Sequence, residues 1–198
     1  MEKFIEQKFN IVELKGISAK NIEEHLKLYA GYVKNANSII EMFGKYNADP
    51  AATSYILGEL GRRFSFEYNG IRNHEVYFAS LEGGPKKITD SSSLKKSIID
   101  AWGSFEEWLN TFKSMATTTR GIGWAVLWYD KKDNRVLASW IDEQHIGQLN
   151  GCKMILALDM WEHSYVADYQ PSGKKQYVED FFENLNWEVI EENFKNAQ

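Results

Sequence analysis

The chain has very few cysteines, prolines and histidines, and each shortage limits what the protein can be. Its 198 residues include one cysteine, three prolines and four histidines. A single cysteine, Cys152, excludes an internal disulfide, a thiolate zinc finger and an iron–sulfur cluster, and it fits a reducing cytoplasm. With so few prolines, helices and strands can run long without interruption.

Long apolar runs and an excess of positive charge are also missing. Residues 1–6 lack the apolar run of a secretory signal peptide, and no later segment is long and apolar enough to span a bilayer. The formal net charge is −5, whereas a nucleic-acid-binding surface is expected to be basic. We therefore expect a cytoplasmic protein with neither a nucleic-acid partner nor a membrane partner.

The first half of the chain has the apolar spacing of two long helices. Ser18 is a good N-cap, and apolar residues recur at helical spacing from there to Gly44, which is a plausible stop. A turn at 47–50 leads to a second helical stretch, weakened at Gly70 and closed by Pro85 and the two glycines before it. Two such helices form a hairpin that can bury its own apolar stripe.

The second half changes from helical to strand periodicity and back. Two short helices are expected at 94–101 and 104–117, and strands at 123–129, 135–141 and 154–158. Further helices are expected at 174–185 and up to residue 194. We therefore predict an α+β fold, in which a long helical hairpin domain (1–86) precedes an α/β domain (87–198) with a small three-stranded antiparallel sheet.

Three of the four histidines and one aspartate fall in stretches that we expect to be buried. His25 and His74 lie on the two long helices, whereas Asp159 and His163 follow the last predicted strand. A buried aspartate beside a histidine is costly unless something neutralises it, and a metal ion is the simplest answer. Three imidazoles and a carboxylate suit iron, manganese or zinc and leave a coordination position open. The alternatives are hydrogen-bonded core histidines and a solvated Glu162–His163 pair.

These residues lie in motifs that resemble those of the iron/manganese superoxide dismutase family. Asp-Met-Trp-Glu-His-Ser-Tyr at 159–165 looks like the family's D-x-W-E-H-x-Y signature, and Asn-His-Glu-Val-Tyr-Phe at 73–78 is similar to its N-H-x-F-Y-W segment. Gly-Ile-Gly-Trp at 121–124 resembles its G-S-G-W entry into the first strand. Further matches at 17–25, 32–37, 177 and 186–188 follow in the right order, so the resemblance covers nearly the whole chain.

The resemblance implies one iron or manganese ion per subunit, held by His25, His74, Asp159 and His163. It also implies that the ion cycles between two oxidation states and converts superoxide to dioxygen and hydrogen peroxide, in a cytoplasmic homodimer or a tetramer. The other implied roles are proton relay by Tyr32, lining of the site by Trp124 and Trp161, and a bond from Glu162 across the dimer to the partner's ligand histidine.

The chain departs from the family pattern at three places. His25 and Tyr32 are seven residues apart, one fewer than usual, but seven residues return to within about 20° on a regular helix. The usual histidine pair after the first ligand and the second tyrosine after E-H-x-Y are missing, with Tyr29 and Val166 in those regions. These absences leave the family's outer hydrogen-bond relay incomplete.

The third departure concerns the glutamine that holds the metal-bound solvent. The family takes it from the second helix, where this chain has Gly70, or from the loop after the second strand. That loop offers Gln144 and His145. We predict that His145 contacts the bound solvent, with Gln144 as the alternative.

Two other functions stay open at this point. The incomplete relay allows a family-like metal-binding protein with little or no turnover. A zinc hydrolase is a weaker alternative, because it needs a general base beside bound water and only Glu162 suggests one. Tyr32, Trp124 and Trp161 also have a simpler interpretation as packing residues.

Overall fold

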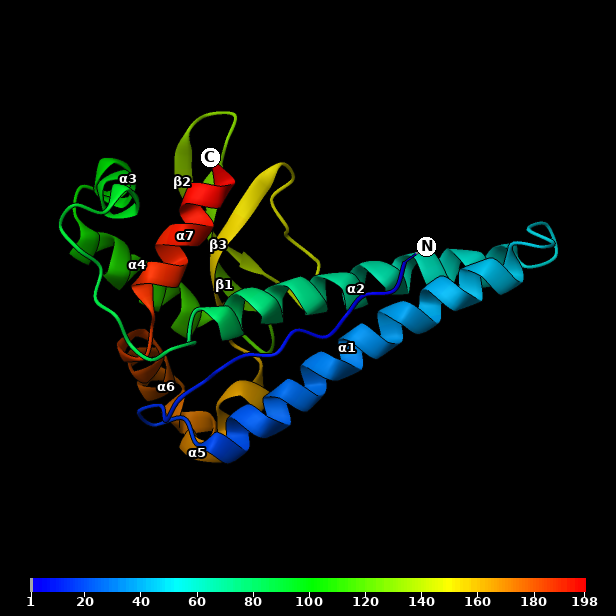
Figure 1. Cartoon of the computed structure of the whole chain (residues 1–198), viewed down its shortest axis with the longest axis horizontal. Coiled ribbons are helices and arrows are strands. Elements are labelled where there is room, and N and C mark those ends of the chain that lie inside the picture. The colour runs from blue at the N-terminus through cyan, green and yellow to red at the C-terminus, as the bar shows by residue number, and fades with distance from the viewer. Residues whose placement is uncertain (1) are drawn as a thin grey trace.

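Two long antiparallel helices form a hairpin that projects beyond the rest of the molecule (Figure 1). The computed structural model describes residues 2–198. Helix α1 spans Ala19–Tyr46 and α2 spans Ser54–Ala79. Ser18 caps α1 as predicted, because its side chain accepts a hydrogen bond from the backbone N–H of Asn21 at 3.1 Å. The predicted helical hairpin is therefore confirmed.

Two glycines do not interrupt these helices as the sequence suggested. Gly44 was expected to end α1, but the helix continues to Tyr46 and is closed by the N–H of Asn47, which donates to Phe43 O. Gly70 lies inside a continuous α2, where the ring of Tyr32 occupies the space that a side chain would need. A helical glycine costs about 1 kcal/mol relative to alanine, which packing can offset.

The second half contains the predicted three-stranded antiparallel sheet. Helices α3 (Ser93–Trp102) and α4 (Phe105–Thr118) lead into β1 (Trp124–Asp130), β2 (Arg135–Ile141) and β3 (Cys152–Asp159). The strand order is β2-β1-β3, and the central strand is buried from Trp124 to Tyr129. The register places Trp124 opposite Asp159, so both side chains start from the same end of the sheet.

Short helices connect the sheet to the C-terminus. They are the 3₁₀ turns η1 (Glu162–Ser164) and η2 (Pro171–Gly173) and the helices α5 (Val166–Tyr169), α6 (Lys174–Glu183) and α7 (Trp187–Ala197). Helices α2 and α7 both contact β3, and η1 contacts α1. The hairpin therefore packs against the end of the sheet that carries Asp159.

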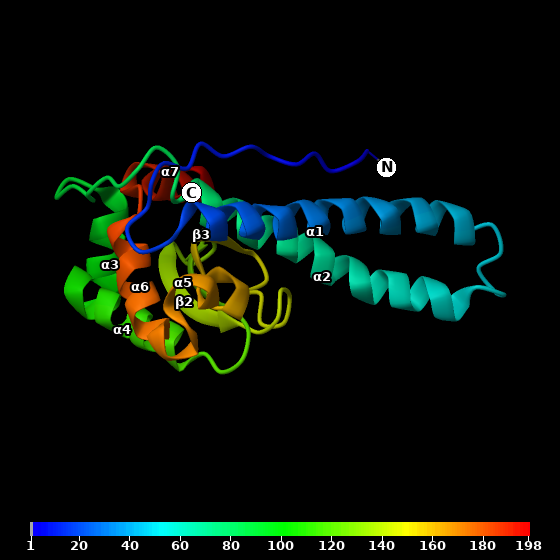
Figure 2. The same ribbon diagram turned by 90° about the horizontal axis from the view of Figure 1, so that it is seen from below.

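The extended N-terminal segment lies along the hairpin (Figure 2). The side-chain amide of Asn37 in α1 bonds both the N–H and the carbonyl of Phe4, at 2.8 and 2.9 Å. At the other end of the hairpin, Lys86 N–H donates to Leu185 O. The two halves are thus joined by several contacts, and the domain boundary at residue 86 stays a prediction. Within residues 2–198, no helix has the length and apolar composition needed to cross a membrane.

Candidate metal centre

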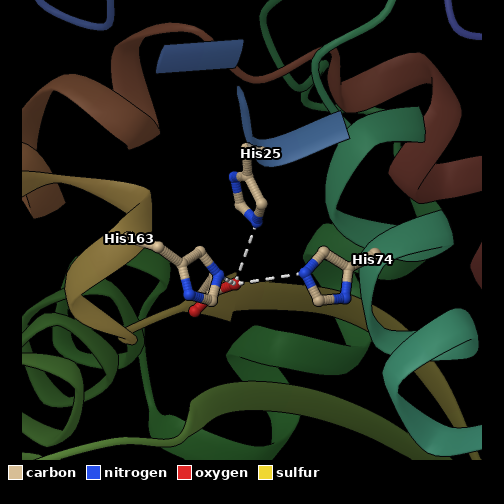
Figure 3. A group of neighbouring side chains, drawn as sticks. His25, His74 and His163 are labelled. Atoms are coloured by element: carbon tan, nitrogen blue, oxygen red, sulfur yellow. Dashed lines mark hydrogen bonds and ion pairs between the residues drawn. The ribbon is translucent and has the colours of Figure 1, made fainter. Parts of the chain in front are cut away.

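The four residues predicted as ligands meet in one cluster (Figure 3). His25 comes from α1, His74 from α2, Asp159 from the end of β3 and His163 from η1. Asp159 Oδ2 lies 3.1 Å from His25 Nε2, 3.2 Å from His163 Nε2 and 3.7 Å from His74 Nε2. The donor atoms all lie within 4.8 Å of one another. Three separate segments of the chain, namely α1, α2 and the stretch from the end of β3 to η1, thus present three nitrogens and one oxygen to the same point.

Asp159 is held in place by three hydrogen bonds to two of its oxygen atoms. Its second carboxylate oxygen, Oδ1, accepts a hydrogen bond from the N–H of Trp161 at 2.8 Å. Its backbone carbonyl accepts bonds from Tyr177 OH at 2.9 Å and from Ser164 Oγ at 3.0 Å. The side chain itself is fully buried. The remaining oxygen, Oδ2, is therefore fixed in its direction toward the histidines.

His74 shows most clearly that the cluster fits a metal ion. Its Nδ1 donates to the carbonyl of Gly70 at 2.6 Å, which leaves Nε2 without a proton and facing Asp159. Nε2 is buried and has no hydrogen-bond partner within residues 2–198. A buried nitrogen without a partner is costly, and coordination to an ion removes that cost. Carboxylate and imidazole donors suit iron, manganese or zinc.

The protonation states of the cluster also suit a metal. Burial, followed by repulsion from His25, lowers the pKa of His74 to about 3. Burial likewise lowers the pKa of His25. Burial alone would raise the pKa of Asp159, but attraction and hydrogen bonding from His163 and His25 hold that pKa well below its usual range. At neutral pH His25, His74 and Asp159 therefore offer unprotonated donors, as metal binding requires.

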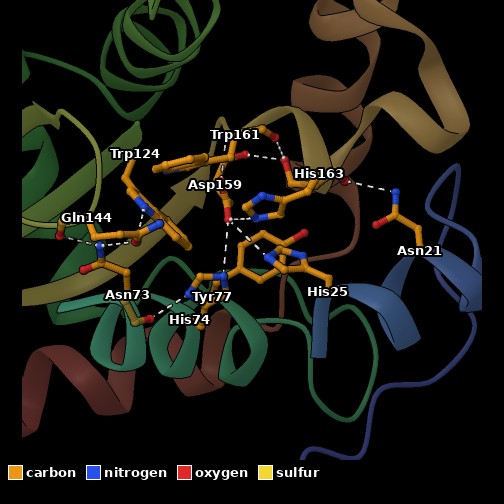
Figure 4. A network of polar contacts seen from close by, with 12 residues as sticks. Asn21, His25, Asn73, His74, Tyr77, Trp124, Gln144, Asp159, Trp161 and His163 are labelled. Atoms are coloured by element: carbon orange, nitrogen blue, oxygen red, sulfur yellow. Dashed lines mark hydrogen bonds and ion pairs between the residues drawn. The ribbon is translucent and has the colours of Figure 1, made fainter. Parts of the chain in front are cut away.

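A series of hydrogen bonds starts at Trp124, whose ring covers His74, passes through Gln144 (both in Figure 4) and ends at Tyr32. The ring of Trp124 packs against His74 at 5.0 Å between centroids, and its Nε1 donates to Gln144 Oε1 at 3.0 Å. Gln144 Nε2 donates in turn to Tyr32 OH at 3.0 Å. Gln144 is fully buried, whereas Tyr32 is partly exposed. These hydrogen bonds thus connect the interior beside the cluster with a partly exposed residue.

Comparison with known proteins agrees with this site. A family model described as "Iron/manganese superoxide dismutases, C-terminal domain" matches residues 90–193. The chain belongs to this family. The match includes Asp159 and His163, and the hairpin adds the two remaining donors of the cluster.

Individual members of the superoxide dismutase family align over most of the chain. A protein of Aquifex aeolicus named superoxide dismutase [Fe] is 34% identical over 189 residues, which cover 93% of this chain and 87% of that protein. One of Mycobacterium intracellulare named superoxide dismutase [Mn] is 31% identical over 175 residues, covering 87% and 82%. One of Pyrobaculum aerophilum named superoxide dismutase [Fe] is 28% identical over 186 residues, covering 91% and 85%. Similar levels of identity thus link the chain to relatives named for either metal.

His145 lies beside Phe66 and Glu143, and its predicted contact with the metal-bound solvent stays a prediction. Its ring packs beside Phe66 at 5.7 Å between centroids, and its Nδ1 lies 3.9 Å from Glu143 Oε2. The neighbouring Gln144 makes the contacts with Trp124 and Tyr32 instead. The loop backbone decides between them: Glu143 has a left-handed φ of 50°, and the N–H and C=O groups of Asp142 and Ile146 pair across the loop.

Asn73 supports the loop that carries Gln144, a role that the sequence analysis did not predict. Its Nδ2 donates to the backbone carbonyl of Gln144 at 3.0 Å, and its Oδ1 accepts a bond from Gln148 Nε2 at 3.3 Å. Trp161 holds the same loop through Nε1, which donates to Glu143 O at 3.2 Å. The only sequence signal for Asn73 was its place directly before the ligand His74.

Glu162 and His163 lie where the cluster reaches the surface of the described chain. The side chains of His25, His74 and Asp159 are fully buried, whereas that of His163 is 22% exposed. Glu162 is exposed. The ring of Trp161 lies 5.8 Å from that of His163 and covers it on one side. One histidine of the cluster is therefore open to contact from outside this chain.

Proposed function

We propose that the protein is a superoxide dismutase with one iron or manganese ion in each subunit. One observation carries this proposal. The donor atoms of four residues lie within 4.8 Å of one another in a largely buried cluster: His25, His74, Asp159 and His163. An ion bound there supplies the electron transfer, cycling between +3 and +2, that turns two superoxide ions and two protons into dioxygen and hydrogen peroxide.

The protein's own part is to hold the ion, keep bulk water away and deliver protons. Trp124 is fully buried against His74, and Trp161 packs on His163, so two indole rings cover the cluster. Such an apolar cover limits solvent access to the site. We infer that these tryptophans line the active site as well as forming part of the core.

Tyr32 and Gln144 are the groups that we assign to proton delivery. Burial raises the pKa of Tyr32, and so does the charge of Asp159, so the phenol keeps its proton at neutral pH. Its hydroxyl accepts a bond from Gln144, and the residue as a whole is partly exposed, so we assign it the exchange of protons with water. We also propose that Gln144, the alternative named from the sequence, contacts the metal-bound solvent in place of His145.

The exposed edge of the site supports a homodimer. We propose that Glu162 of one subunit hydrogen-bonds His163 of the other and thereby fixes that imidazole. The exposure of Glu162 and the 22% exposure of the His163 side chain allow this contact. Whether dimers associate further into tetramers is a separate question, to be settled by measuring mass in solution.

A cytoplasmic location is part of the same proposal. It rests on the single cysteine, Cys152, which cannot form an internal disulfide.

The net charge of the protein does not help it to attract superoxide. With a net charge of −5, the protein as a whole does not attract an anionic substrate, so attraction must come from local cations.

The test is to prepare the metal-free protein, load it separately with iron, manganese and zinc, and measure metal content and superoxide consumption. We expect one ion per subunit, activity with iron, manganese or both, and none with zinc, which does not change oxidation state. Stoichiometric iron and manganese with no activity from either would contradict the proposal and favour a metal-binding protein without turnover.

A further inference from the structure

Tyr29 is a fully buried tyrosine whose hydroxyl joins three parts of the chain. It donates a hydrogen bond to Glu75 Oε1 at 3.2 Å and accepts one from the backbone N–H of Gln7 at 2.9 Å. Tyr29 lies one turn after His25 on α1, and Glu75 directly follows His74 on α2. The hydroxyl thus links the two helical turns that carry ligand histidines, and ties both to the N-terminal segment.

The ring of Tyr29 also contacts the surroundings of the cluster directly. It stacks against the ring of His74, with 6.4 Å between centroids and 28° between planes. On other sides it meets the rings of Phe78 at 6.2 Å and Phe9 at 5.9 Å. A tyrosine packed this tightly has little freedom to reorient, so its hydroxyl stays directed at Glu75.

Glu75 is held as firmly as Tyr29. Its second oxygen, Oε2, pairs with Arg72 Nη1 at 2.5 Å, and its side chain is only 11% exposed. The guanidinium of Arg72 lies over the rings of Tyr68 and Phe4, at 5.2 and 5.7 Å from their centroids. Hydrogen bonds to a charged group are about twice as strong as neutral ones, so the Tyr29–Glu75 contact is a firm link between the helices.

We propose that Tyr29 and Glu75 are a positioning pair that sets the distance between ligands His25 and His74. The reason lies in how His74 is held: its one hydrogen bond among the described residues goes to Gly70 in its own helix. That bond fixes the imidazole on α2 but not relative to α1. The Tyr29–Glu75 bond ties the two helices together beside the ligands, one turn after His25 and one residue after His74. This inference rests on the metal site proposed above.

The test compares two tyrosine-to-phenylalanine variants of the metal-loaded protein. Tyr29→Phe keeps the packed ring but removes the hydroxyl. Tyr129→Phe is the matched control, because Tyr129 is also buried and its hydroxyl also donates to a side-chain oxygen, Asn134 Oδ1 at 2.6 Å, in the β1–β2 hairpin. The measurements are the rate of metal loss to a chelator such as EDTA, the metal's electron paramagnetic resonance spectrum and its reduction potential.

We expect Tyr29→Phe to lose metal about 10-fold faster than the unmodified protein and to change the spectrum and the potential, with Tyr129→Phe unchanged in all three. Wild-type release rate, spectrum and potential in Tyr29→Phe would overturn the proposal, even if thermal stability fell. These readouts compare variants of the metal-loaded protein, so they stay meaningful if that protein proves inactive toward superoxide.

A second variant tests whether the two residues act together. Glu75→Ala removes the acceptor, and we expect it to speed metal loss to a similar degree. If the two residues form one unit, the double variant should release metal no more than about twofold faster than the faster single variant. Rates that multiply in the double variant would overturn the pairing.

Discussion

Gly70 lies directly against the ring of Tyr32, so that a Cβ added to Gly70 would come within 2.5 Å of Tyr32 Cδ1. The same glycine accepts, through its carbonyl, the hydrogen bond of the proposed ligand His74, at 2.6 Å. One helical position thus serves both the tyrosine that we assign to proton delivery and the orientation of a metal ligand. The absence of a side chain is what allows the two roles to coincide.

Replacing Gly70 by alanine should therefore destabilise the protein and displace Tyr32. The new methyl group overlaps a ring rather than a flexible chain end, and overpacking of this kind costs about 1–3 kcal/mol. Urea unfolding of the metal-free protein measures the loss, and turnover of the loaded protein should fall as the contact between Tyr32 and Gln144 is disturbed.

The control for this variant is Gly58→Ala in the same helix. No atom lies within 4 Å of a Cβ at Gly58, so alanine should stabilise α2 there by about 0.5–1 kcal/mol. If both alanine variants changed stability in the same direction, the contact between Gly70 and Tyr32 would not be the cause.

Replacing His163 by alanine should abolish stoichiometric metal binding. The variant removes a nitrogen that lies 3.2 Å from Asp159 Oδ2, and the three donors that remain leave the site incomplete. Metal content is measured by elemental analysis after purification and after reconstitution. His145→Ala is the matched control, because it removes the one histidine outside the cluster and should keep a full complement of metal. Full retention of metal in His163→Ala would refute the ligand assignment.

Replacing Gln144 by alanine should lower turnover by about 10- to 100-fold while metal stays bound. The variant removes both hydrogen bonds that connect Trp124 with Tyr32. Superoxide consumption per bound metal ion, together with the reduction potential, measures the effect. His145→Gln serves for comparison and should change neither quantity. A larger effect from His145→Gln than from Gln144→Ala would restore the assignment first made from the sequence.

Acidification should destabilise the metal-free protein below about pH 6.5. The pKa of His74 is lowered from 6.5 to about 3 in the folded state. Between those values the unfolded chain binds a proton at this residue that the folded protein does not, so the free energy of unfolding falls as pH falls, by ~1.4 kcal/mol per pH unit. Above pH 6.5 this contribution is fully present.

Urea unfolding at pH 7, 6 and 5 measures how steeply the free energy of unfolding changes with pH. His74→Gln, which removes the titrating imidazole, should show a shallower dependence than the unmodified protein, although His25 contributes in the same direction. Equal slopes for the two proteins would show that His74 does not carry the effect.

Much of the fold could be predicted because periodicity and capping act locally. Ser18 and Ser104 cap helices where the pattern placed them, each accepting a bond from a backbone N–H three residues later. The four ligand candidates could be named because buried histidines are few and Asp159 follows an apolar strand. Gly44 and Gly70 were misjudged, because helix propensity is a weak preference that helix length and tertiary contacts override.

The residues that surround the four proposed ligands could not be predicted in the same way, because their contacts depend on loop and side-chain conformations that hydrophobic periodicity does not reveal. Gln144 makes the contacts with Trp124 and Tyr32 in a loop where Glu143 has a left-handed backbone, and adjacent loop residues leave no sequence pattern that distinguishes Gln144 from His145. Tyr29 belongs to a region where the sequence suggested only a missing outer relay, yet its hydroxyl turns inward to Glu75. The bond assigned to Glu162 depends on a second subunit and stays a prediction.

The origin of the four proposed ligands in three separate segments of the chain has a consequence for how the protein matures. His25 and Asp159 are 134 residues apart, so a ribosome must synthesise most of the chain before the pair can meet. The hairpin emerges first, with only two of the four donors. Metal capture therefore belongs to the end of folding, and the time at which a nascent chain first retains iron or manganese should mark the docking of its two halves.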